Sequence, residues 1–222
     1  MGSGRDGEWS GVIRYARRLA AWLAGGILAF ALLLHGDTAI AAAPPSPQSA
    51  APVSQPDLDQ LMGLLARRKH GQVTYEEKDY LSDLEEPLKS SGVLIYDAPD
   101  HLEKRTLKPR LASVVLDHGM VTVQRGHRTY HLELSSYPQV APYVDAIRAT
   151  MAGDRSALER VFKVSFEGSL ERWELGLVPL DKKIARGVKG IQIKGARDDV
   201  QTVEITQPDG DRSVMTMGPP GG

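Results

Sequence analysis

The chain has 222 residues, with 27 Lys and Arg, 28 Asp and Glu, and no cysteine. A net charge of −1 at pH 7 gives neither the basic excess expected of a nucleic-acid-binding protein nor a strong attraction to anionic lipid. The lack of cysteine excludes disulfides, thiolate chemistry and acylation at a lipoprotein cysteine.

The first 41 residues have the pattern of an export signal. Arg14, Arg17 and Arg18 form a basic region, and an apolar stretch, 19–34, follows it. The sequence Ala39-Ile40-Ala41 predicts cleavage before Ala42 and release into the periplasm. Because the apolar stretch is shorter than the roughly 20 residues of a bilayer span, an uncleaved inner-membrane anchor is the alternative. The Arg17-Arg18 pair leaves a twin-arginine signal open.

Three regions follow the signal. Residues 42–56 read AAPPSPQSAAPVSQP, a Pro/Ser/Ala-rich composition that predicts a flexible tether. Residues 57–217 form one domain, long enough for a single sizeable core. Residues 218–222 are expected to be a disordered tail.

The domain is predicted to begin with a helix and continue with strands. Asp57 is a suitable N-cap, apolar residues recur at helical spacing from Leu58 to Leu65, and Gly71 is expected to end the helix. Residues 117–119, Asp-His-Gly, read as a tight hairpin turn. Alternation and turn signals predict strands over 72–81, 89–96, 101–107, 113–116, 120–124 and 127–134.

Helices then interrupt the strands. One is predicted over 138–152, with Pro138 in its first turn, and a second short one follows Asp154 as its cap. Strands return over 162–166, 172–178, 190–194, 202–206 and 213–217, with a short helix over 181–187. This order predicts an α+β fold, an incomplete and strongly curved antiparallel β-barrel of about 10–11 strands whose open concave face is covered by helices.

The apolar strand residues carry the main functional signal. Alternation places them on one face, where they either fill a simple core or line a cavity for alkyl chains: Leu94, Tyr96, Leu102, Val114, Leu116, Val121, Val123, Leu132, Trp173, Leu175, Ile191, Ile193, Val203 and Ile205. Met62, Met151 and Phe166 would be adaptable lining. The helix over 138–152 is predicted to act as a lid through Val140, Val144, Ile147 and Met151.

No pattern predicts catalysis, a cofactor or a metal. There is no GxSxG motif and no glycine-rich phosphate loop. His127 and His131 share a strand face but lie about 13 Å apart, too far for one ion. The acidic run 76–79 is expected to be solvated. Glu103 and Arg105 are expected to share the outer face and to make cross-strand charge pairs there, while Lys104 points away from them.

Two stretches of the domain resemble the LolA family, the periplasmic carriers of outer-membrane lipoproteins. Residues 91–102, SGVLIYDAPDHL, are similar to the family's G-x-L-x-Y/W-x-x-P strand and turn. Residues 108–123, KPRLASVVLDHGMVTV, resemble its second hairpin, and the last strands with Gly210 at a turn fit its final hairpins. The resemblance covers nearly all of 57–217.

This resemblance implies a half-barrel with a helical lid around a hydrophobic cavity. The expected function is a monomeric, non-enzymatic carrier that binds acyl chains of a lipoprotein or other lipid and ferries them to the outer membrane. An inner-membrane exporter and an outer-membrane acceptor are its expected partners. Ala98 stands where the family has an arginine that holds the lid closed. The alternatives are a lipid-sensing regulatory module of the same fold and an accessory subunit of a lipid or aryl-polyene assembly and export system.

Overall fold

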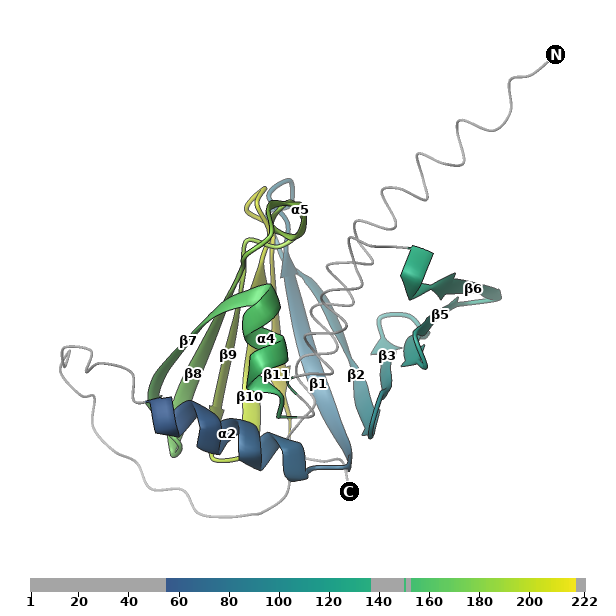
Figure 1. Cartoon of the computed structure of the whole chain (residues 1–222). Coiled ribbons are helices and arrows are strands. Elements are labelled where there is room, and N and C mark those ends of the chain that lie inside the picture. Colours follow the sequence, from purple (N-terminus) through teal and green to yellow (C-terminus); the bar gives the residue numbers. More distant parts are fainter. Residues whose placement is uncertain (1–54, 137–149, 151–152, 219–222) are drawn as a thin grey trace.

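The computed structural model describes residues 55–136, 150 and 153–218 (Figure 1). The predicted signal, most of the tether, most of the predicted helix over 138–152 and the last four residues lie outside this range. Among the described residues, no helix has both the length and the apolar character needed to cross a membrane.

The described residues form one antiparallel sheet of eleven strands in the order β6-β5-β4-β3-β2-β1-β11-β10-β9-β8-β7. β6 and β7 are its two edges, so the sheet is not closed, and the prediction of an incomplete antiparallel barrel is confirmed. The strand bounds are β1 (His70–Tyr80), β2 (Leu88–Asp97), β3 (His101–Lys108), β4 (Ala112–Asp117), β5 (Met120–Arg125), β6 (Arg128–Glu133), β7 (Phe162–Ser169), β8 (Arg172–Pro179), β9 (Gly190–Ala196), β10 (Asp199–Thr206) and β11 (Arg212–Met217).

Each half of the sheet is a meander of hairpins. Strands β1 to β6 pair with their neighbours in the chain, and so do β7 to β11. The two halves meet where β1 pairs with β11, from Tyr75 opposite Met217 to Tyr80 opposite Arg212. The first and last strands of the domain therefore lie side by side at the centre of the sheet, as Figure 1 shows.

Helix α2 (Gln55–Arg67) and the short helix α4 (Arg155–Val161) pack on the same face of the sheet (Figure 1). Helix α2 buries Leu58, Leu61, Met62 and Leu65, which are spaced as one helical stripe. The predicted cap of α4 is confirmed, because the Asp154 carboxylate accepts a hydrogen bond from the Ala157 N–H at 2.9 Å.

Two smaller helical elements also belong to the described structure. Helix α5 (Lys182–Ala185) follows its cap Asp181, and the 3-10 helix η1 (Leu134–Ser136) follows β6. Two boundary predictions for α2 were wrong. It begins at Gln55, so Asp57 lies in its first turn, and it ends at Arg67 because β1 already pairs with β2 from His70 onward, which makes Gly71 a strand residue.

Candidate functional site

The predicted cavity residues all belong to the face of the sheet that α2 and α4 cover. Thirteen of the fourteen are at most 7 % exposed, and Leu132, on the edge strand β6, is partly buried against the same core. The strand register places them in rows across the sheet. Leu102 lies opposite Leu116, which lies opposite Val121, and a similar row joins strands β8, β9 and β10.

Two neighbours of Leu94 show which face is which. Leu94 is 1 % exposed, while Val93 and Ile95, on the opposite face, are half-buried. Met62 and Phe166 also belong to the core, and Met151 lies outside the described residues. Burial alone fits a packed core as well as a lipid-binding surface, so the lipid role of this face stays a prediction.

The predicted lid residues Val140, Val144, Ile147 and Met151 lie outside the described residues, so the lid also stays a prediction. Leu134, before this segment, and Thr150, within it, are buried. Gly153 then follows with a φ of 69°, and a Cβ there would lie 2.6 Å from the Met62 carbonyl oxygen of α2. Only glycine allows the chain to pass so close to α2 in this conformation.

The apolar face contains a buried ion pair. Lys104 of β3 donates to the Glu77 carboxylate of β1 at 2.7 Å, and the two side chains are 1 % and 2 % exposed. The serines on either side of β1, Ser90 of β2 and Ser213 of β11, also donate to Glu77, at 3.1 and 3.0 Å. Four strands thus contribute to one network, as the cost of burying a charge requires.

Tyr75 extends this network across strand β2. Its hydroxyl lies 2.8 Å from the Thr106 hydroxyl of β3, and the register runs from Tyr75 to Gly92 to Thr106. The Tyr75 side chain therefore spans β2 at Gly92. A Cβ at Gly92 would collide with the Arg105 carbonyl oxygen, so this crossing has room for glycine alone. The Lys104 ammonium lies 5.1 Å from the centre of the Tyr75 ring, within cation–π range.

Burial shifts two ionisation equilibria at this network. It raises the pKa of Tyr75 to about 12, and therefore this phenol stays neutral. Burial is also the largest cause that raises the pKa of Asp79 to about 6, followed by the negative charge of Glu77 two residues away. A hydrogen bond from Ser213 and the charge of Lys104 act in the opposite direction on the Asp79 pKa. Asp79 therefore titrates close to neutral pH.

A family model described as "Outer membrane lipoprotein carrier protein LolA-like" matches residues 50–218. The chain belongs to this LolA-like family. The match includes every described strand and helix of the sheet domain.

No curated protein matches this LolA-like chain. Among solved structures, a LolA superfamily protein from Nitrosomonas europaea is 12% identical, covers 76% of this chain and 92% of its own, and has a TM-score of 0.39. A chain of the MucA/MucB complex of Pseudomonas aeruginosa is 14% identical. The match covers 75% of this chain and 59% of that chain, with a TM-score of 0.41. The lipoprotein LppX of Mycobacterium tuberculosis is 9% identical. The match covers 74% of this chain and 95% of the LppX chain, with a TM-score of 0.40.

In this LolA-like protein, Ala98 lies in the turn between β2 and β3. The Ala98 side chain packs against the core, and its N–H donates to the Lys69 carbonyl at 2.7 Å. A small apolar residue therefore occupies the position where the resemblance implied an arginine that holds the lid. Among the described strands, the buried cation is Lys104, which pairs with Glu77.

Two predictions about charged residues of the LolA-like domain were wrong. Glu77 is not solvated but buried. Lys104 points away from Glu103 and Arg105, as predicted, and its side chain is buried. Glu103 and Arg105 do share the outer face, but they pair within one strand, at 3.0 Å, rather than across strands. The burial of Lys104 agrees with the alternation along β3, since Leu102 and Thr106 on the same face are both buried.

Proposed function

We propose that this LolA-like protein is a periplasmic carrier that binds the acyl chains of a lipoprotein or another lipid and moves that cargo toward the outer membrane. The observation that carries the proposal is the single apolar face of an open sheet. All eleven strands contribute apolar side chains to this face, and the edge strands β6 and β7 do not pair with each other.

The open edges matter because they leave the width of the sheet adjustable. A small closed barrel has its interior filled by side chains, and widening it would break strand pairing. Here the β1–β6 and β7–β11 meanders can move apart at their free edges while the β1–β11 pairing stays intact. Alkyl chains could then replace side-chain contacts on the apolar face.

Burial of alkyl chains supplies the affinity without any catalytic group. Each buried methylene contributes about 0.8 kcal/mol, so one long chain provides substantial binding energy. The same magnitude opposes release into water. Delivery therefore requires an acceptor that offers an equally apolar environment, and we expect an inner-membrane exporter on one side and an outer-membrane acceptor on the other. No enzymatic activity is needed for this cycle.

We infer export to the periplasm from the sequence of the first 41 residues, which has the pattern of a signal. Cleavage before Ala42 would release a protein without a lipid anchor, because there is no cysteine to acylate. The tether 42–56 would then be the free N-terminus of the carrier.

Native mass spectrometry of protein purified gently from the periplasm tests the proposal. We expect a chain that begins at Ala42, together with a second species heavier by the mass of a bound lipid or lipoprotein. Partial delipidation with detergent should convert the second species to the first. A protein that never carries lipid, and that takes up none from mixed phospholipid vesicles, would contradict the carrier function.

A further inference from the structure

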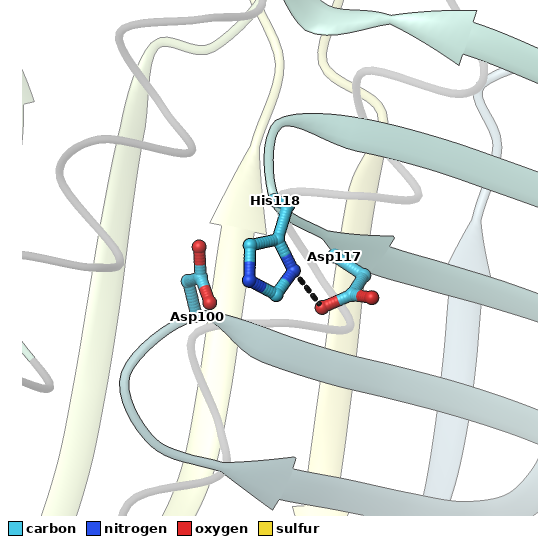
Figure 2. Close-up of side chains that lie close together, drawn as sticks. All are labelled: Asp100, Asp117 and His118. Carbon is cyan, nitrogen blue, oxygen red and sulfur yellow. Dashed lines mark hydrogen bonds and ion pairs between the residues drawn. The ribbon is translucent and has the colours of Figure 1, made fainter.

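Three side chains from two neighbouring turns meet at one end of the sheet. Asp100 lies in the β2–β3 turn, Asp117 ends β4, and His118 lies in the β4–β5 turn. One ligand atom from each lies within 4.8 Å of the others. Figure 2 shows the His118 ring between the carboxylates of Asp100 and Asp117.

The strand register explains this meeting. Leu102 pairs with Leu116, so the turn before β3 and the turn after β4 emerge at the same end of the sheet. His118 has a φ of 46°, the left-handed conformation that this tight turn requires. Local sequence could not predict that Asp100 and His118 lie close together, because only the β3–β4 pairing brings them to the same end of the sheet.

The His118 ring is held by one carboxylate and directed at the other. Its Nδ1 donates to Asp117 Oδ1 at 2.8 Å, which leaves Nε2 to act as a ligand. A carboxylate that accepts from the second ring nitrogen is the usual partner of a metal-binding histidine, because it fixes the ring and its tautomer. His101 Nδ1 lies 3.7 Å from the same Asp117 oxygen and adds a second imidazole beside the group.

We propose that Asp100 and His118 Nε2 bind a divalent transition-metal ion, with zinc as the best fit, while Asp117 holds the His118 ring through Nδ1. Zinc accepts imidazole nitrogen and carboxylate oxygen at about 2.0–2.2 Å, and water or His101 would complete four ligands. Tetrahedral ligands around zinc lie about 3.4 Å apart, so ligand atoms as much as 4.8 Å apart must approach each other by up to about 1.4 Å. The side chains are half-buried or exposed, and small rotations achieve this contraction.

A bound ion would link the β2–β3 turn to the β4–β5 turn and stiffen that end of the sheet. This property is separate from the proposed carriage of lipid, and either can fail without the other. Because only the folded chain brings the two turns together, zinc should also raise the melting temperature.

Calorimetric titration of the protein with zinc chloride tests the site. The protein is purified in the form that the cell produces, without an affinity tag, and is treated with a chelator and dialysed. We expect one zinc ion to bind per chain, and His118→Asn and Asp100→Asn to weaken the affinity by more than about tenfold. Asparagine at 118 tolerates the left-handed backbone, and the His118 side chain is 81 % exposed, so the variant should fold.

His127→Asn is the matched control, because His127 is also an exposed turn histidine but lies in the β5–β6 turn. It should bind zinc like the wild type. Zinc should raise the melting temperature of the wild type and of His127→Asn, and leave that of His118→Asn unchanged. A wild type that binds no zinc would overturn the proposal. So would zinc binding that survives both His118→Asn and Asp100→Asn, or that falls equally in His127→Asn.

Discussion

Glu77 and Lys104 form a 2.7 Å ion pair on the apolar face of the sheet, and strand β2 lies between the strands that carry them. The pair joins the centre of the sheet to its N-terminal half. Buried pairs of this kind add little stability compared with apolar residues of the same size, but losing one partner is costly. The pair therefore contributes more to the relative positions of β1 and β3 than to the free energy of unfolding.

Lys104→Met should destabilise the domain by about 3–5 kcal/mol, since it leaves the Glu77 charge buried without its partner. The double variant Glu77→Gln/Lys104→Met should recover part of that loss. Urea unfolding followed by circular dichroism measures both. Lys194→Met is the control, because Lys194 pairs with Glu174 on the exposed face at 3.1 Å and should cost at most about 1 kcal/mol. Similar losses for the Lys104 and Lys194 variants would show that the buried pair has no special role.

The pH dependence of stability should report on Asp79. Its pKa is about 6 in the folded chain and 3.8 without the fold, so the folded state favours the protonated form. The resulting stabilisation is complete below pH 3.8 and is lost as the pH rises through 6. Asp79→Asn should therefore be more stable than the wild type at pH 7.5, by on the order of 1 kcal/mol, and should lose that advantage near pH 4. Unfolding curves at several pH values would refute this if the difference between the two proteins stayed constant.

Gly92→Ala should be strongly destabilising, because the new methyl group meets the Arg105 carbonyl of β3 where the sheet has a bulge. Gly63→Ala is the matched control. A Cβ at Gly63 contacts nothing within 4 Å, and alanine in a helix is favoured over glycine by roughly 0.5–1 kcal/mol. Thermal unfolding should move in opposite directions for the two variants. A Gly92→Ala protein as stable as the wild type would mean that the strands separate easily at this crossing.

Leu94→Glu should weaken folding and abolish binding of a fluorescent fatty acid, because it places an unpaired carboxylate on the apolar face. Glu103→Gln, on the outer face beside Arg105, should change both by little. Each variant needs a melting curve as well as a binding curve. If Leu94→Glu folds and still binds the probe, the acyl chains do not use this face.

Local patterns in the sequence were enough to predict the strands and their turns. In β8, for example, Trp173, Leu175 and Leu177 alternate with exposed or half-buried residues, and that alternation is visible without a structure. The cap Asp154 was an equally local signal.

Long-range pairing could not be predicted in the same way. Nothing near β1 indicates that it pairs with β11, and only that pairing brings Ser213 to Glu77. Alternation was enough to predict that Lys104 points away from Glu103 and Arg105, but its burial depends on Glu77 of another strand. Asp100 and His118 also required the β3–β4 register before their proximity was visible.

The most direct test of the lipid-binding face uses fluorescence quenching by a brominated fatty acid. Trp173 is the sole tryptophan after residue 41, so Trp173→Phe gives a silent background for a chain cleaved before Ala42. Into this background, Tyr96→Trp places a reporter on the apolar face and Ile95→Trp places one on the opposite face. We predict strong quenching at position 96 and little at position 95. Stronger quenching at position 95, or none at either position while mass spectrometry shows the fatty acid bound, would contradict binding on this face.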